Sequence, residues 1–258
     1  MSTTPLPSAE SHTALLPLSL ARAAVLIPAW EPDRTLIPLA ASLLTLGFGA
    51  IIIVNDGSSS GCAEIFAELE TLDRVNILCH AINLGKGRAL KNGVNYFLCE
   101  LPGFEVLVTA DADGQHACTD IARVAQAALE HSSKAILGSR GFVKDVPLRS
   151  RIGNALTRHI FAFVTGARLM DTQTGLRAFP RTLLPELIAL EGERYEYEMN
   201  VLAHICRTGS NPLEVPIQTI YFDGNKSSRF NPIRDSMSIY FVLVRAFRIS
   251  LTSRASVL

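Results

Sequence analysis

The sequence lacks an excess of either charge. Its 258 residues contain 24 Lys and Arg against 24 Asp and Glu, which gives a formal net charge of zero at pH 7. A protein that binds nucleic acid through phosphate contacts normally carries a basic excess. We therefore expect no nucleic-acid partner.

The sequence also lacks a long apolar segment, although apolar residues are abundant. Hydrophobic residues make up 48% of the chain and charged residues 19%, so it can bury a large core and is not expected to be disordered. No uninterrupted apolar run reaches the roughly 18–20 residues that a membrane-spanning helix needs. The composition indicates a globular protein of one large domain or two small ones.

Cysteines are few and scattered. The five cysteines form no Cys-x-x-Cys pair and no Cys/His cluster, so the sequence predicts neither a zinc site nor a disulfide framework. Free thiols are typical of a reducing compartment. Residues 1–22 predict a flexible leader without the positive charge that begins a signal peptide, and we expect a cytoplasmic protein.

Short apolar runs alternate with segments of helical spacing. The runs predict strands at residues 24–27, 50–54, 75–79, 106–109 and 135–137. Such a series predicts an α/β protein with a mostly parallel, twisted sheet and helices on both faces. Ligands bind beyond the carboxyl ends of the strands in these sheets, so we expect the site in the loops that follow them.

These loops carry side chains suited to a phosphorylated ligand. Asp56 follows the second predicted strand, where it could accept hydrogen bonds from a base or ribose, although Asp-Gly-Ser is also typical of a plain turn. Asp111 and Asp113 stand two apart, so on extended backbone both point to one side. With the amide oxygen of Gln115, these carboxylates suit Mg²⁺ or Mn²⁺ carrying substrate phosphates, although a single Asp-x-Asp is also common in solvated loops.

A glycine-flanked lysine, Gly85-Lys86-Gly87, follows the third predicted strand. The sequence contains no Gly-x-Gly-x-x-Gly after the first strand and no phosphate-binding loop of the Gly-Lys-Ser/Thr type, so neither of those nucleotide sites is predicted. Two interpretations stay open. The glycines permit a turn that begins a helix, or they let Lys86 and the backbone amides approach a base or phosphate.

Motifs in these loops resemble, in their order, those of the family 2 glycosyltransferases. They are Pro28-Ala29-Trp30-Glu31, Asp56-Gly57-Ser58, Asn83-Leu84-Gly85-Lys86-Gly87, Asp111-Ala112-Asp113-Gly114-Gln115-His116, Gly138-Ser139-Arg140, Asp171-Thr172-Gln173-Thr174-Gly175-Leu176-Arg177 and Gly224-Asn225-Lys226-Ser227-Ser228. The likeness covers roughly residues 23–245 and is greatest to the branch of dolichyl-phosphate mannose and glucose synthases and their bacterial polyprenyl-phosphate counterparts. Trp30 departs from the Tyr and Asn usual at that position, which affects base recognition and not the fold.

The resemblance implies a GT-A fold over residues 23–232 and a UDP- or GDP-linked sugar as donor. The residues that it assigns to donor binding are Pro28, Ala29, Glu31, Asp56, Lys86, Asp111, Ala112 and Asp113. Asp111, Asp113 and Gln115 would coordinate Mg²⁺ or Mn²⁺. Asp171 and Gln173 would contact sugar hydroxyls, although an Asx-type turn explains them equally. Glu198 would face the sugar or, as an early acid, favour the N-terminus of a helix.

The implied reaction inverts the anomeric carbon and passes the sugar to a polyprenyl phosphate. A phosphate monoester has a second pKa of about 6, so it needs positioning more than a general base, and Asp113 would at most assist. Such an acceptor needs cations. The candidates are Arg140, Arg149 and Arg151, with Lys226 and Ser227 in a lid over residues 222–232. Solvated surface charge is the alternative for the three arginines, and His116 is expected to be a simple loop residue.

Residues 233–258 predict an amphipathic tail. Its apolar side chains are interrupted by Arg245 and Arg248, which excludes a membrane span but allows a helix at the membrane surface or one packed on the sheet. Peripheral contact with the cytoplasmic face of a membrane is therefore an open expectation. A glycolipid or saccharide hydroxyl as acceptor is the alternative function. A non-catalytic nucleotide-sugar-binding protein is the third hypothesis, against which Asp111, Asp113 and Gln115 argue.

Overall fold

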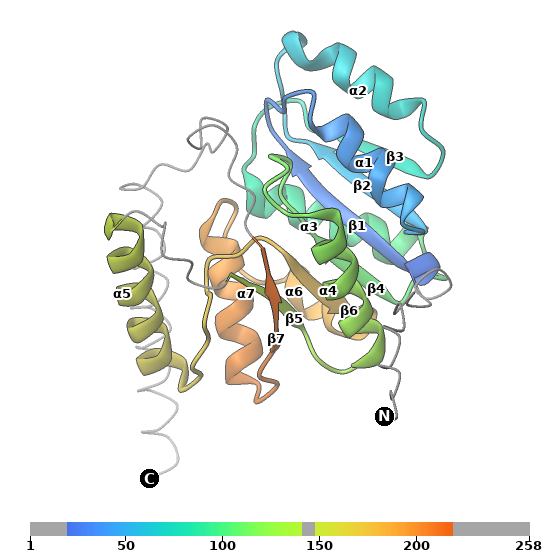
Figure 1. Ribbon diagram of the computed structural model, residues 1–258. Coiled ribbons are helices and arrows are strands. Elements are labelled where there is room, and N and C mark those ends of the chain that lie inside the picture. The colour runs from blue at the N-terminus through green and yellow to red at the C-terminus, as the bar shows by residue number, and fades with distance from the viewer. Residues whose placement is uncertain (1–19, 141–147, 219–258) are drawn as a thin grey trace, which may run out of the picture.

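The computed structural model describes residues 20–140 and 148–218, with residues 148–156 described by their backbone only (Figure 1). The strands are β1 (Ala23–Ala29), β2 (Ala50–Asn55), β3 (Val75–Cys79), β4 (Val106–Thr109), β5 (Ile136–Arg140), β6 (Arg177–Pro180) and β7 (Leu213–Ile217). The α-helices are α1 (Leu36–Thr45), α2 (Ala63–Glu70), α3 (Lys86–Glu100), α4 (Cys118–Glu130), α5 (Leu148–Thr165), α6 (Leu184–Ile188) and α7 (Glu196–Arg207). Short 3₁₀ helices lie at Leu20–Arg22, Ser60–Cys62 and Arg181–Leu183.

The seven strands form one sheet in the order β3-β2-β1-β4-β6-β5-β7. The pairs β1/β2, β2/β3, β1/β4 and β5/β7 are parallel, and β6 runs antiparallel to both β4 and β5. The predicted α/β class with a mostly parallel sheet is confirmed. The chain leaves β1 toward β2 and β3, then returns to place β4 on the other side of β1, so the strand order reverses there. In open α/β sheets this reversal opens a crevice at the carboxyl ends of the strands.

Helices cover both faces of the sheet because its strands are apolar on both sides. In β1, Val25 and Ile27 belong to the core under α1, α2 and α4, whereas Ala24 and Leu26 belong to the core under α3, α6 and α7. Figure 1 shows the two groups of helices on opposite faces. The sheet is thereby held from both sides, and the loops at its carboxyl edge start from fixed strand ends.

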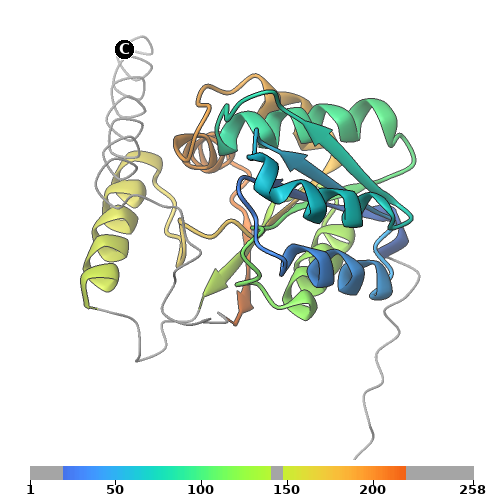
Figure 2. The same cartoon turned by 90° about the horizontal axis from the view of Figure 1, so that it is seen from above.

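Helix α5 lies at one end of the sheet beside α7, apart from the helices on the two faces (Figure 2). Phe161 of α5 is fully buried and belongs to a small third core with Leu169, Leu202 and Cys206. Among the residues that the structure describes, no helix is long and apolar enough to cross a membrane.

The N-terminal boundary differs from the prediction. Leu20 is only 1% exposed and Leu20–Arg22 form a 3₁₀ helix against the sheet, so the folded part includes residues that we assigned to a leader over 1–22. Leu20 packs with the core of α1 and α4, which explains its order. The rest of the leader, Lys226 and Ser227 in the predicted lid, and the tail over 233–258 lie outside the described residues.

Candidate functional site

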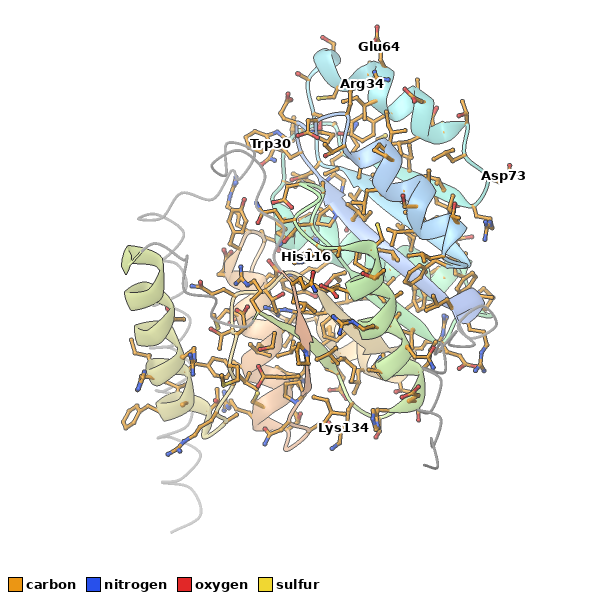
Figure 3. The ribbon with its side chains drawn as sticks, in the orientation of Figure 1. Trp30, Arg34, Glu64, Asp73, His116 and Lys134 are labelled. Atoms are coloured by element: carbon orange, nitrogen blue, oxygen red, sulfur yellow. The ribbon has the colours of Figure 1, made fainter. Side chains whose placement is uncertain are left out.

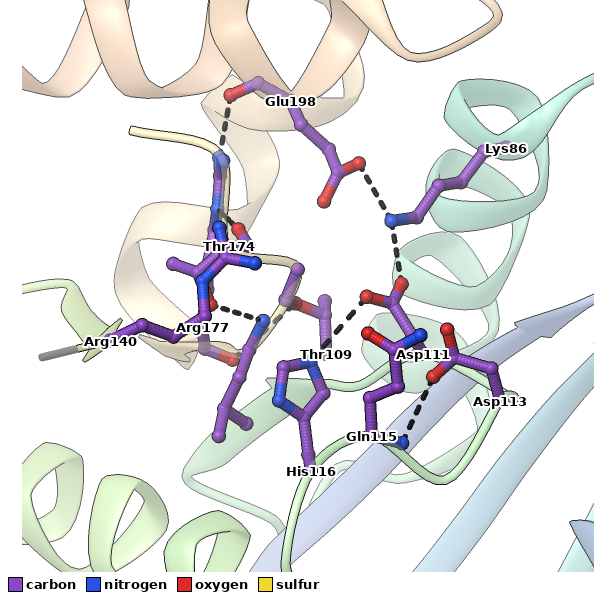
Figure 4. A network of polar contacts seen from close by, with 12 residues as sticks. Lys86, Thr109, Asp111, Asp113, Gln115, His116, Arg140, Thr174, Arg177 and Glu198 are labelled. Carbon is purple, nitrogen blue, oxygen red and sulfur yellow. Dashed lines mark hydrogen bonds and ion pairs between the residues drawn. The ribbon is translucent and has the colours of Figure 1, made fainter. Parts of the chain in front are cut away.

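The predicted site loops meet where the strand order reverses, at the carboxyl ends of β1, β2 and β4. Figure 4 shows Asp111 and Asp113, from the loop after β4, facing Lys86 at the start of α3 and Glu198 in the first turn of α7. In Figure 3, His116 lies near the centre of the molecule, whereas Asp73 and Lys134 lie at its periphery. The structure therefore brings acidic and basic groups from three segments to one edge of the sheet.

Lys86 joins two carboxylates. Its Nζ lies 2.7 Å from Asp111 Oδ1 and 2.8 Å from Glu198 Oε2, with Lys86 18%, Asp111 31% and Glu198 14% exposed. Burial lowers the pKa of Lys86, but Asp111 and Glu198 outweigh it and hold that pKa well above its usual value. Burial likewise raises the pKa of Asp111, but Lys86 and then His116 hold it well below its usual range. Both groups are therefore charged at neutral pH.

Asp113 lies beside Asp111 without a cation of its own among the contacts described. Its Oδ1 accepts a hydrogen bond from the backbone N–H of Gln115 at 3.1 Å. Burial and then the neighbouring Asp111 charge raise its pKa. Figure 4 shows the Gln115 side chain next to both carboxylates. Two carboxylates crowded at a strand end form a place where an added cation is favoured.

This donor set fits a divalent cation that shares its coordination with a substrate. No group of three or more His, Cys, Asp or Glu side chains that could hold a metal is found within residues 20–140 and 157–218. Mg²⁺ and similar hard cations commonly take only one or two carboxylates from the protein and complete their shell with phosphate oxygens and water. Asp111, Asp113 and the amide oxygen of Gln115 suit such a shared site, in which phosphate oxygens and water supply the remaining ligands.

The position of Asp111 is fixed by tight packing around it. A Cβ at Gly175 would lie 2.4 Å from Asp111 Oδ2, so only glycine fits there. Thr109 Oγ1 donates to the Gly175 carbonyl oxygen at 2.9 Å and so holds the glycine against the carboxylate. His116, which we expected to be a simple loop residue, is 8% exposed with Nε2 3.4 Å from Asp111 Oδ2. The prediction for His116 is wrong, because its ring packs into the site.

Asp56 is buried and bonded to the loop that follows β3. It is 2% exposed, and its two carboxylate oxygens accept hydrogen bonds from Asn83 Nδ2, the N–H groups of Leu84 and Gly85, and His80 Nδ1. The geometry therefore favours a role in holding the loop that leads into α3. The predicted contact of Asp56 with a base or ribose stays a prediction.

The first predicted motif is also tied to its neighbours. The carboxylate of Glu31 accepts hydrogen bonds from the Ser59 N–H and from Ser59 Oγ, and the Glu31 N–H donates to Ser58 Oγ. Ala29 is fully buried, and its carbonyl oxygen accepts from the Asp56 N–H at 2.8 Å. Pro28 and Ala112 are half-buried. Glu31 and Ala29 therefore link the loops after β1 and β2, and the direct ligand contact that we predicted for them stays a prediction.

Arg140 and Asp171, predicted for the acceptor phosphate and the sugar, form an ion pair with each other. Arg140 Nε lies 2.6 Å from Asp171 Oδ2, and its Nη2 lies 3.1 Å from Oδ1. The N–H of Gln173 also donates to Asp171 Oδ1, while Gln173 itself is exposed. Burial raises the pKa of Asp171, but Arg140 outweighs it and holds that pKa low. Asp171, 5% exposed, therefore anchors Arg140, and direct sugar contact by Asp171 is not supported.

The other predicted residues divide into two groups. Glu198 faces Lys86, while Glu196 holds the segment before α7, because its Oε1 accepts from the N–H groups of Glu193 and Arg194. Arg149 and Arg151 fall in the first turn of α5, where the structure describes the backbone alone. Their predicted contact with the acceptor stays a prediction.

From the sequence we assigned no role to Arg177, although it lies in one of the motifs, and we did not single out His80. Arg177 is 2% exposed and donates to the carbonyl oxygens of Thr174 and Glu198, which joins the loop before β6 to α7. An arginine inside a short, apolar strand is expected to be buried and therefore to need hydrogen-bond acceptors close by, which is the signal that could have identified Arg177. His80 follows β3 directly, at the same edge of the sheet as the other site loops, and its position alone could have drawn attention to it.

The comparisons with known proteins agree with this geometry. The sequence profile described as "Glycosyl transferase family 2" matches residues 25–187. The chain belongs to this family. It is thus a glycosyltransferase, as the resemblance in its motifs predicted, and the family match runs from within β1 to within α6.

Relatives and solved structures extend the match. The chain is 34% identical over 215 residues to the UDP-N-acetylglucosamine–dolichyl-phosphate N-acetylglucosaminyltransferase of Methanococcus voltae, covering 76% of this chain and 85% of that protein. It is 29% identical to the polyprenol monophosphomannose synthase of Mycolicibacterium smegmatis over 65% of each chain. Glucosyl-3-phosphoglycerate synthase of Mycobacterium tuberculosis, solved with Mn²⁺, UDP-glucose and phosphoglyceric acid, superposes with a TM-score of 0.67 at 16% identity, covering 89% of this chain and 82% of that one. The predicted GT-A fold is confirmed.

Proposed function

We propose that this glycosyltransferase moves a sugar from a nucleotide-diphosphate donor to a polyprenyl phosphate, with inversion and with Mg²⁺ or Mn²⁺. The observation that carries the proposal is the pair Asp111 and Asp113 at the point where the strand order reverses, faced by Lys86. The sequence relatives whose names specify a dolichyl or polyprenol acceptor support the choice of acceptor. A UDP- or GDP-linked sugar is the proposed donor class.

Asp111, Asp113 and Gln115 would hold the metal, which supplies Lewis-acid stabilisation of the charge that develops on the leaving diphosphate. Lys86 contributes a second positive charge from the start of α3. Its ammonium stands between Asp111 and Glu198, so it lies within reach of a diphosphate bound at the acidic pair. The positive end of the α3 dipole points the same way, which also favours an anion there.

A polyprenyl phosphate attacks as a dianion and needs cations to hold it in line. Arg140 at the end of β5 has its guanidinium oriented by Asp171, so its charge is fixed before the acceptor binds. Arg149, Arg151, Lys226 and Ser227 are further proposed acceptor contacts, on sequence grounds. An acceptor of this kind brings the enzyme to the cytoplasmic face of a membrane, where we propose peripheral association.

A hydroxyl acceptor on a glycolipid or saccharide is the second candidate, and one observation favours it. Burial and Asp111 raise the pKa of Asp113, and a carboxylate with a raised pKa is a better general base than an ordinary aspartate. A hydroxyl acceptor needs such a base, whereas a phosphate dianion does not. The acceptor, offered with and without its phosphate, therefore separates the two candidates.

The test is a transfer assay with Mn²⁺ or Mg²⁺, a panel of UDP- and GDP-sugars, and either a polyprenyl phosphate or the matching polyprenol. We expect a glycosyl phosphate product with the phosphate acceptor alone, and inversion at the anomeric carbon by NMR. Asp113→Asn is expected to abolish transfer, with Lys134→Met as a matched surface control that keeps full activity. Equal transfer to the polyprenol would favour the hydroxyl candidate, and activity in a metal-free chelator solution would overturn the metal requirement.

A further inference from the structure

His80 is a buried, polar side chain that the proposed reaction has not yet used. Its side chain is 6% exposed, and its Nδ1 lies 2.7 Å from Asp56 Oδ1. On the opposite side of the ring, Asn92 Nδ2 lies 2.8 Å from Nε2. An amide nitrogen only donates, so Nε2 accepts, and the proton of the ring is on Nδ1. Asn92 thereby makes His80 a donor toward Asp56.

The acceptor of that proton, Asp56, controls the loop before α3. Asp56 Oδ1 also accepts from the Leu84 N–H at 2.9 Å, and Oδ2 accepts from the Gly85 N–H at 2.8 Å. These bonds need both carboxylate oxygens aimed at the loop, and the His80 bond fixes the rotation of the carboxylate. A buried carboxylate loses much of its stabilisation when one donor is removed.

The loop in turn sets the position of Lys86. Gly85 has a φ of 105° and a Cβ there would lie 2.5 Å from the Glu193 carbonyl oxygen, so the turn has little freedom to shift. Lys86 follows as the first residue of α3, and its side chain reaches Asp111 and Glu198. A contiguous series of hydrogen bonds therefore leads from Asn92 through His80 and Asp56 to the loop that presents Lys86.

We propose that His80 is a positioning residue for the donor site, acting through Asp56 on Leu84 and Gly85 and thus on Lys86. It touches neither donor nor acceptor. The effect of His80 on catalysis rests on the proposed function, in which Lys86 serves as a cation for the diphosphate. The effect of His80 on the loop is independent of the proposed function. Loss of the Nδ1 donor should loosen the loop and weaken nucleotide binding, while the chemical step changes little.

Two substitutions and one control test this inference. His80→Leu keeps the bulk but removes the donor. His80→Asn carries an amide nitrogen that can take the place of Nδ1, so it should rescue. Tyr96→Phe is the matched control, because it removes a 2.9 Å hydrogen bond from α3 to Asn76 of β3 without touching Asp56. Thermal unfolding of all three proteins checks that they fold.

The first readout is hydrogen exchange of the Leu84 and Gly85 amides by NMR, which needs no substrate. In His80→Leu we expect exchange about tenfold faster at these two amides, with wild-type rates in His80→Asn and Tyr96→Phe. The ¹⁵N signals of the His80 ring, assigned by their loss in the variants, should be those of a neutral ring protonated at Nδ1. An Nε2-protonated ring, or unchanged exchange in His80→Leu, would refute the inference.

The second readout is titration of UDP and GDP in the presence of Mn²⁺. We expect His80→Leu to weaken binding of the preferred nucleotide by about tenfold, and transfer assays to show a raised donor KM with kcat within about twofold of wild type. Faster exchange with unchanged nucleotide affinity would overturn the link between loop and donor site. If wild-type protein binds neither nucleotide, the proposed function fails, while the exchange data still decide whether His80 holds the loop.

Discussion

Replacing Lys86 by Met removes the only cation that the described contacts place between Asp111 and Glu198. Removing one partner of a buried ion pair costs about 3–5 kcal/mol, because a charge stays behind without compensation. Asp111 is 31% exposed, so water reduces that cost, and we expect a loss of about 2 kcal/mol in the metal-free protein. For a chain of this size the loss corresponds to a fall in Tm of about 4–8 °C.

The same substitution should make the acidic pair a better metal site. In the wild type, a divalent cation has to compete with Lys86 for Asp111, whereas in Lys86→Met it meets two uncompensated carboxylates. A gain of about 1.4 kcal/mol would tighten Mn²⁺ binding to nucleotide-free protein about tenfold. At about 100 times its Kd, Mn²⁺ adds about 2.7 kcal/mol of stability, which would offset the loss. The variant should therefore have a lower Tm than the wild type without Mn²⁺ and a Tm close to that of the wild type with Mn²⁺.

The sign of the pH dependence follows from the two pKa shifts. The pKa of Lys86 is raised, so its contribution is present below its unfolded value of about 10.4 and is lost at higher pH. The pKa of Asp111 is lowered, so its contribution is present above its unfolded value of about 3.9 and is lost as the pH falls further. The stability difference between wild type and Lys86→Met should thus be constant from about pH 5 to 9.

Differential scanning fluorimetry across this pH range, with and without Mn²⁺, and calorimetric titration of Mn²⁺ measure these effects. Lys134→Met, at an exposed position just before β5 and at the periphery of the molecule in Figure 3, is the matched control and should match the wild type. Mn²⁺ affinity that is equal or weaker in Lys86→Met would refute the competition between Lys86 and metal. A stability loss that Mn²⁺ leaves unchanged would refute Asp111 as a ligand.

Three further changes test neighbouring parts of the site. Asp113→Asn should stabilise the metal-free protein more at pH 7 than at pH 4, because the raised pKa makes the ionised carboxylate costly above about pH 3.9. Urea unfolding at the two pH values measures this difference. The same variant should lose the rise in Tm that Mn²⁺ causes. Gly175→Ala should displace the Asp111 carboxylate and weaken Mn²⁺ binding at least tenfold by calorimetry, because the new Cβ would lie 2.4 Å from Oδ2; wild-type affinity would contradict the packing argument. Asp171→Asn leaves Arg140 without its counter-charge and should lower the free energy of unfolding by about 2 kcal/mol near neutral pH. The difference from the wild type should shrink below about pH 4, because the pKa of Asp171 is lowered in the folded protein. Chemical unfolding at several pH values measures it.

The sequence predicted the part of the fold that local patterns encode. The strand at residues 106–109 is buried throughout and is a continuous apolar run, so it matches the structure in both bounds. The half-buried edge strand at residues 75–79 also matches in both bounds. The strand β7 was not predicted, because Glu214 and Pro216 interrupt its apolar pattern; it pairs with β5 alone among the described strands. Helix α6 is five residues long and gives too little periodicity to recognise.

The site residues were predicted better than their partners. Lys86, Asp111 and Arg140 do gather at the carboxyl edge, and Asp56 bonds the loop that leads to Lys86, because the rule for parallel sheets places strand-end loops there. The sequence could not tell that Asp56 meets His80 or that Arg140 meets Asp171, since these pairs join segments 24 and 31 residues apart through tertiary packing. Spacing along a chain indicates which edge of the sheet a residue occupies, but not which neighbour its charge will find there.

The zero net charge of the chain has a counterpart inside the site. The carboxylates of Asp111 and Asp171 are paired with Lys86 and Arg140, so two ion pairs of the site are already formed before a ligand binds. A doubly negative diphosphate and a divalent cation therefore enter together most favourably, because each takes over a partner that the other releases: the cation joins Asp111 and Asp113, and Lys86 becomes available to the phosphate. Binding of either one alone has to break the ion pair of Lys86 and Asp111 without giving both partners a replacement. This exchange of partners predicts strong positive coupling between Mn²⁺ and nucleotide in the wild type, and Lys86→Met should reduce that coupling by making metal binding independent of nucleotide.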